Sequence, residues 1–124
     1  MLNKHKYTLF KNTSYALSGL VDIFKNEKSF RLQLLLFVIL TIAIWVLPFS
    51  IISKFVLQIV SMLPIYAEII NSAIERVVDL VTTDYHILAK QAKDAGSALV
   101  FVSFVIELIV WIMVIYLNFL IGNY

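Results

Sequence analysis

Acidic and polar side chains recur at helical spacing between residues 67 and 81, in sequence otherwise too apolar for a water-exposed helix. On a helix, residues three and four apart return to the same side, so this stretch presents one polar face. That face contains Glu68, Ser72, Glu75 and Asp79, with Asn71 at its edge. Carboxylates next to a bilayer are energetically costly and usually serve a function. This face is therefore the first candidate for a functional site.

The carboxylates of this face could act at different depths. Glu75 and Asp79, nearer the end of the stretch, could bind a hard cation through oxygen. Glu68 lies deeper in the apolar sequence and could accept a proton from a hydroxyl group. A metal ion, a positioned base and a cation facing phosphate are the parts that phosphoryl transfer needs.

A polar stripe with two lysines follows the 82–83 threonine pair, either member of which could cap the start of a third helix. The stripe consists of His86, Lys90, Lys93 and Ser97, with Asp94 beside it. Lys93 could neutralise phosphate charge. The residues alone also allow a simpler alternative, in which the acidic helix end is only solvated and paired with these lysines.

The glycine content restricts how a nucleotide could be held. The only glycines are Gly19, Gly96 and Gly122, so no glycine-rich phosphate-binding loop is present. Any ATP site would have to be built from the side chains of packed helices.

Composition places the chain in a membrane. The 124 residues are 61% hydrophobic with a mean hydropathy of +0.92, whereas soluble domains are roughly half apolar. The net charge of +2 is too small to indicate nucleic acid as a partner. The lack of cysteine excludes disulfides and a thiol nucleophile.

The hydropathy pattern predicts an all-α integral membrane protein with a single domain over residues 1–124. An amphipathic helix over about 5–26 is expected on the membrane surface, although it could instead be a soluble cap on the bundle. Membrane spans are expected at about 30–48, 52–80 and 97–120. Ser29 is expected to cap the first span, and Pro64 to bend the second.

The distribution of lysine and arginine predicts the orientation. Six of these residues lie before the first span or in its first turn, the first loop has only Lys54, and the C-terminal tail has none. Because positive charge collects on the cytoplasmic side, the N-terminus and the acidic-to-basic region are expected there.

Three sequence runs resemble the prokaryotic membrane diacylglycerol kinase family: EIINSAIERVVDL, then DYH, then AKDAGSA. Gly19-Leu20, and Asn26-Glu27 followed by Phe30-Arg31, match the N-terminal pattern of that family. The resemblance implies a homotrimer in the bacterial cytoplasmic (inner) membrane, with one surface helix and three spanning helices per subunit. It also implies transfer of the γ-phosphate of MgATP to the primary hydroxyl of a lipid alcohol, with Mg²⁺ as the cofactor.

The same resemblance implies a role for each matching residue. It makes Glu68 the catalytic base and makes Glu27 and Glu75 the metal-binding carboxylates. Asn71 and Asp79 would support the site. The expected nucleotide contacts are Tyr15, Asp84, Tyr85, His86, Lys93 and Asp94, and the expected lipid entrance is formed by Arg31, Gln33 and Ser97.

Several positions depart from the family pattern. The run 16–20 is ALSGL where members often have SWKGL, Thr8 stands where an arginine would bind nucleotide, and Gln33 stands where many members have glutamate. Glu107 is unexpected in the third span, where it could be protonated at a subunit interface or paired with Gln58. Diacylglycerol is the expected substrate, undecaprenol is the alternative, and a non-enzymatic channel or assembly subunit is the rival of another class.

Overall fold

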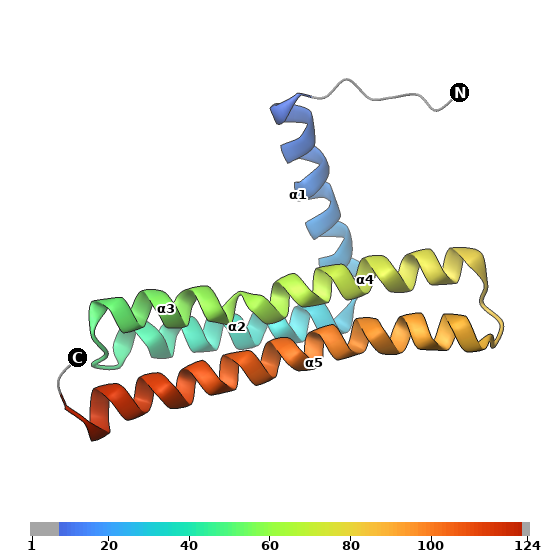
Figure 1. The fold of residues 1–124 in the computed structure, drawn as a ribbon. Helices are drawn as coiled ribbons and strands as arrows, with labels where there is room; N and C mark the ends of the chain where they lie inside the picture. The colour runs from blue at the N-terminus through green and yellow to red at the C-terminus, as the bar shows by residue number, and fades with distance from the viewer. Residues whose placement is uncertain (1–7, 123–124) are drawn as a thin grey trace.

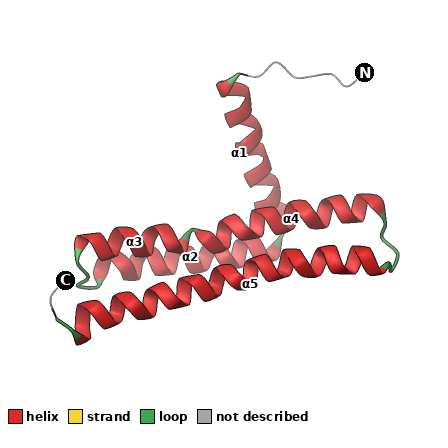
Figure 2. Ribbon diagram, viewed as in Figure 1, coloured by secondary structure: helices red, strands yellow, loops and turns green. Residues whose placement is uncertain are grey.

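The computed structural model describes residues 8–122, which form helices joined by short connections (Figure 1; Figure 2). In chain order these are α1 (Leu9–Asn26), α2 (Lys28–Val46), α3 (Ile51–Ser61), α4 (Leu63–Val81) and α5 (Ile87–Ile115), followed by a π-helical turn, η1 (Tyr116–Leu120). The described part of the chain contains no strand. The predicted all-α class is confirmed.

Three segments are long and apolar enough to cross a membrane: α2, α3 together with α4, and α5 together with η1. The middle segment is interrupted at Met62, whose N–H donates to the carbonyls of Ile59 and Val60. Pro64 lies in the first turn of α4, where its missing N–H removes no helical hydrogen bond. The predicted disturbance near Pro64 is thus a short break between two helices.

The predicted cap of the first span is wrong. The first span begins two residues earlier than a Ser29 cap requires, because Lys28 is already helical and Glu27 occupies the capping position. Ser29 therefore lies inside α2, where its hydroxyl is available to a neighbouring helix. Thr8 caps α1 by accepting the Lys11 N–H, and residues 5–7 of the predicted surface helix lie outside the described residues.

The predicted start of the third helix is also wrong. Thr82 is extended and ends α4, and its hydroxyl accepts the N–H of Asp84 in the connection. The cap of α5 is His86, whose Nδ1 accepts the N–H of Leu88 at 3.1 Å. Residues 82–86 therefore reverse the chain direction, and α5 begins at Ile87.

The helices divide into a bundle and one projecting arm (Figure 1). The segments α2, α3–α4 and α5 run side by side, whereas α1 points away from them. The α4–α5 connection lies at one end of the bundle, and the α2–α3 connection lies at the other with the end of α5. Both α4 and α5 extend past the α1–α2 junction, so polar residues on them can surround that junction.

The apolar core lies near the α2–α3 connection. Buried Ile44, Phe49, Leu57 and Val114 pack together there, with Val110 and Trp111 against them. The buried polar residues of α4, by contrast, are Glu68, Asn71 and Ser72, beyond the Met62 break. One half of the bundle is thus held by apolar packing, and the other carries the polar cluster.

Candidate active site

Glu68 is the centre of the polar cluster. It lies on α4, and the residue is only 5% exposed. The Ser29 hydroxyl donates to Oε1 at 2.7 Å, and the Gln33 amide donates to Oε2 at 2.8 Å. Both donors lie on α2, four residues apart and therefore on one helix face. A buried carboxylate needs such partners, because an unpaired one is strongly disfavoured.

A cavity of about 280 Å³ adjoins Glu68 and gathers several of the predicted residues. It is lined by Ser29, Glu68, Asn71, Glu75, Ser97 and Val100. The Asn71 amide donates to Glu75 Oε1 at 3.4 Å, while Asn71 Oδ1 is buried with no hydrogen-bond partner among the described residues. The predicted base, one predicted metal ligand and one predicted lipid contact therefore share a single space between α2, α4 and α5.

The α4–α5 approach depends on Gly96. A Cβ at this position would overlap Asn71 Oδ1 and lie 3.3 Å from Asn71 Cγ. A side chain of any size would therefore displace the amide that lines the cavity. Small residues allow helix backbones in membranes to approach closely, and here that approach also sets the position of Asn71.

Glu27 is held at the junction of α1 and α2 by residues of α4. The Ser72 hydroxyl donates to Glu27 Oε1, and the Arg76 guanidinium pairs with the same oxygen at 3.0 Å. Arg76 also pairs with Asp22 of α1. Arg76 thus links the last turn of α1 to the polar face of α4.

Arg31, a predicted lipid contact, lies at the same junction. Its guanidinium donates to the carbonyls of Phe24 and Lys25, at 2.7 and 3.0 Å. These carbonyls belong to the last turn of α1, where a cation satisfies unpaired acceptors. Arg31 therefore provides hydrogen-bond donors for the C-terminal carbonyls of α1.

The two predicted metal ligands reach the same part of α4 with different partners. Glu27 contacts Ser72, and Ser72 lies three residues before Glu75 on the helix. No group of three or more histidine, aspartate or glutamate side chains suited to a metal occurs among the described residues. Magnesium is usually held by one or two carboxylates together with substrate phosphates. Glu27, Glu75 and the unpaired Asn71 oxygen are hard oxygen donors that fit this kind of site.

The predicted nucleotide contacts that follow α4 in the chain gather around the α4–α5 connection. A second cavity, of about 390 Å³, is lined by residues that include Asp84, Tyr85, His86, Lys93 and Asp94. Their ion pairs join Lys93 to Asp79 at 2.7 Å and Lys90 to Asp94 at 2.6 Å. The pairing of the acidic helix end with a lysine, which the simpler alternative predicts, is present, and both side chains of the Lys93–Asp79 pair are about half exposed.

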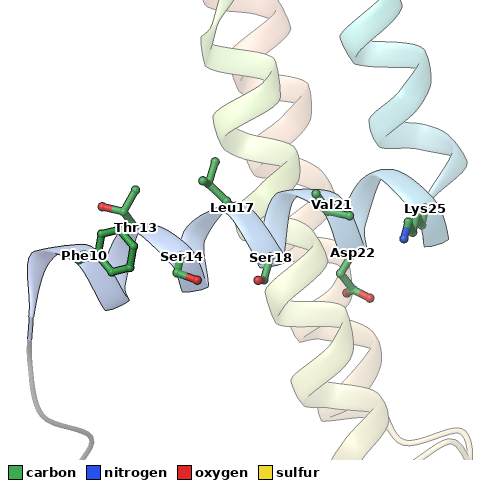
Figure 3. A pocket seen from close by; sticks show the side chains of 8 residues that line it. All are labelled: Phe10, Thr13, Ser14, Leu17, Ser18, Val21, Asp22 and Lys25. Carbon is green, nitrogen blue, oxygen red and sulfur yellow. The ribbon is translucent and has the colours of Figure 1, made fainter.

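Tyr15 lies apart from these residues, on the projecting helix. It is half-exposed and lines neither cavity described above. Another face of α1 carries a hollow of about 580 Å³, lined by Phe10, Thr13, Ser14, Leu17, Ser18, Val21, Asp22 and Lys25 (Figure 3). Every residue of that lining comes from α1, so within the described chain no second helix covers this face.

Comparison with known proteins places the chain in a family. A family model described as prokaryotic diacylglycerol kinase matches residues 14–115. The chain belongs to the prokaryotic diacylglycerol kinase family. It is 43% identical over 104 residues to a diacylglycerol kinase of Haemophilus influenzae, covering 83% of this chain and 87% of that one. It is 35% identical over 112 residues to a diacylglycerol kinase of Escherichia coli K12, covering 90% and 91%.

Membership of the prokaryotic diacylglycerol kinase family makes this chain a lipid kinase of a bacterial membrane, and the non-enzymatic alternative falls away. A kinase of this kind uses ATP with a divalent metal. A diacylglycerol kinase of Pseudomonas aeruginosa is also similar, with 37% identity over 99 residues and 80% of each chain covered.

Sequence reasoning missed three residues that the structure places around the predicted ones. Ser29 and Arg76 bind the predicted carboxylates, and Gly96 sets the position of Asn71. Ser72 was placed on the polar face, but its contact with Glu27 was not predicted. One signal was available for Ser29, because it lies four residues before Gln33 on the same helix face.

Glu107 is buried between α2 and α5, and its predicted partner is wrong. Gln58 instead donates to Thr41 at 3.0 Å and accepts from Trp45 at 2.9 Å. Glu107 Oε1 is buried with no hydrogen-bond partner in the described chain. Glu107 lines an apolar cavity of about 280 Å³ with Trp111.

Proposed function

We propose that this protein transfers the γ-phosphate of MgATP to the hydroxyl of diacylglycerol, giving phosphatidic acid and ADP. The observation that carries the proposal is the Glu68 site, in which a buried carboxylate is held through both oxygens beside a cavity. The relatives named diacylglycerol kinase, which cover most of the chain, support diacylglycerol as the acceptor.

In the proposed reaction, the hydroxyl oxygen of the lipid attacks the γ-phosphorus atom. Its proton passes to Glu68, a new P–O bond forms, and the bond between the γ-phosphorus and the β,γ-bridging oxygen breaks. ADP leaves with the electrons of that bond. Glu68 suits this role because it is buried, fixed in orientation and next to a cavity that can admit the hydroxyl.

Glu27 and Glu75 would hold Mg²⁺, with Asn71 in support. When bound, the ion neutralises charge on the phosphates during transfer. Lys93, whose ammonium group pairs with Asp79, would add positive charge that neutralises phosphate. The cavity at the α4–α5 connection, with Asp84, Tyr85, His86 and Asp94, would hold the nucleotide.

We also propose the placement of the protein in the inner membrane, with α1 on the cytoplasmic surface and three copies forming a homotrimer. The basic residues before the first span support the cytoplasmic side for the N-terminus. The lysines of α1 would face anionic lipid, and Tyr15 would contact nucleotide from that helix. With that orientation, the polar half of the bundle faces the compartment that contains ATP.

The test is phosphorylation by the purified protein in mixed micelles, with diacylglycerol and undecaprenol offered separately. Higher kcat/KM for diacylglycerol supports the proposal, and higher kcat/KM for undecaprenol assigns the same mechanism to another lipid alcohol. Transfer to neither lipid by folded protein would refute it.

Glu68→Gln tests the proposed base in the same assay. It is expected to lower kcat by about 100-fold or more, because general-base catalysis contributes roughly 10²–10⁴-fold. Binding of a non-hydrolysable ATP analogue should be retained, because Glu68 lines the lipid-side cavity rather than the nucleotide cavity. Normal turnover by this variant would remove Glu68 from the role of base.

A further inference from the structure

The two carboxylates at the junction of α1, α2 and α4 are held in different ways. Glu27 pairs with a cation, the Arg76 guanidinium, and also accepts from Ser72. Glu68 accepts hydrogen bonds from Ser29 and Gln33, which are both uncharged. Of the two carboxylates, only Glu27 is therefore paired with a cation among the described residues.

The two neutral donors together fix the orientation of the Glu68 carboxylate. Ser29 donates to one oxygen at 2.7 Å and Gln33 to the other at 2.8 Å, so rotation of the group would break at least one bond. Each carboxylate oxygen has two lone pairs, so each can still accept a second hydrogen bond. Ser29 also lines the cavity beside Glu68, which places one of the two bonds at the edge of that space.

We propose that Ser29 and Gln33 are positioning residues for the base, acting as a pair that aims the Glu68 carboxylate at the acceptor hydroxyl in the cavity. This inference rests on the proposed function, in which Glu68 takes the proton of a lipid alcohol. It means that Gln33 affects the reaction by orienting Glu68, rather than by contacting the lipid. It also gives a positioning role to Ser29, whose sequence position suggested only a helix cap.

The test compares Ser29→Ala and Gln33→Met with Gln58→Met as the matched control. Gln33→Met keeps the length of the side chain and removes the donor. Gln58 is also a hydrogen-bonded glutamine in a spanning helix, but its partners are Thr41 and Trp45, away from Glu68. Each site variant is expected to lower kcat by about tenfold, within the roughly 10²–10⁴-fold that a general base contributes, with KM for ATP unchanged.

The double variant, with Ser29→Ala and Gln33→Met together, distinguishes loss of the orientation of the Glu68 carboxylate from a loss of packing at either position. Each single variant leaves one donor on the carboxylate, so losing both should reduce kcat by more than the product of the two single effects. The loss in the double variant should not exceed that of Glu68→Gln. Ser29→Thr keeps a hydroxyl and is expected to retain most of the wild-type kcat.

A second readout does not need turnover. The carboxylate stretching band of Glu68 can be found as the infrared difference between the wild type and Glu68→Gln. This band responds to hydrogen-bond donors, so it should shift in Ser29→Ala and in Gln33→Met and stay in place in Gln58→Met. The proposal is supported if, in both site variants, the Glu68 band shifts and kcat falls as described.

Two results would overturn the inference. An unmoved band in both site variants would show that the hydrogen bonds are absent, and a shifted band with wild-type kcat would show that they do not position the base. Failure of the proposed function is recognised separately, because the wild type would then phosphorylate neither lipid before any variant is compared.

Discussion

Replacing Gly96 with alanine should disable the active site more than it destabilises the fold. The added Cβ would overlap Asn71 Oδ1 and lie 3.3 Å from Asn71 Cγ and 3.6 Å from Ile74 Cδ1. Gly19 is the matched control, because a Cβ there has no heavy atom within 4 Å. Both glycines lie inside helices, so alanine gives each helix the same intrinsic gain of about 1 kcal/mol.

The magnitude follows from opposing effects at Gly96. Overpacking in a closely packed site costs about 1–3 kcal/mol, which the helical gain partly offsets. Gly19→Ala should therefore be stabilised by roughly 1 kcal/mol, and Gly96→Ala should be destabilised by up to about 2 kcal/mol. Restoring ordinary contact requires the Asn71 amide to move by about 1 Å, and a displacement of that size in an active site can reduce the rate about 100-fold.

The assay pairs initial rates in mixed micelles with denaturant unfolding followed by circular dichroism. A double-mutant cycle with Asn71→Ala identifies the clash, because without the amide the Gly96→Ala change should no longer be destabilising. Wild-type kcat in Gly96→Ala would refute the reasoning. So would an equal loss of stability with and without the Asn71 side chain, because the overlap would then lie elsewhere.

Two further substitutions test other contacts of the structure. Arg76→Gln removes the cation that pairs with Glu27. In a direct binding titration, the Mn²⁺ concentration for half-saturation should therefore fall by several-fold. The free energy of unfolding should change by under about 1 kcal/mol, because the Arg76–Glu27 pair is partly exposed. Unchanged Mn²⁺ affinity would contradict competition for Glu27. Glu107→Leu should stabilise the fold by about 1 kcal/mol without changing kcat, because it removes a buried acceptor that lacks a partner in the described chain. Loss of stability on denaturant unfolding would show that Glu107 has a partner beyond these contacts.

Much of the fold could be predicted from apolar periodicity, and the errors lie at helix ends. The long apolar runs indicated three spanning segments, and Pro64 marked the interruption of the second. At residues 82–86, however, Thr82, Thr83 and His86 are all possible cap acceptors. The choice depends on where α4 stops and how many residues the chain needs to reverse direction. That is a tertiary constraint, which local sequence does not contain.

The candidate site could be predicted by residue type but not by partner. The spacing of Glu68 and Glu75 on one helix follows from helical geometry alone. The contacts of Ser29 and Arg76 depend instead on how α1 and α2 are rotated against α4, which is decided by packing across the whole bundle. Cross-helix hydrogen bonds of this kind join residues 39 and 45 positions apart in the chain, such as Ser29 to Glu68 and Glu27 to Ser72.

The different partners of Glu27 and Glu68 also explain why spacing alone left their roles open. Both are glutamates at the same junction, and both contact a serine hydroxyl. The difference is the charge of the remaining partner, which is the Arg76 guanidinium for Glu27 and the Gln33 amide for Glu68. Arg76 places a cation beside Glu27, whereas Gln33 places an uncharged donor beside Glu68. This difference in partners supports the proposal that Glu27 binds a cation and that Glu68 acts as the base.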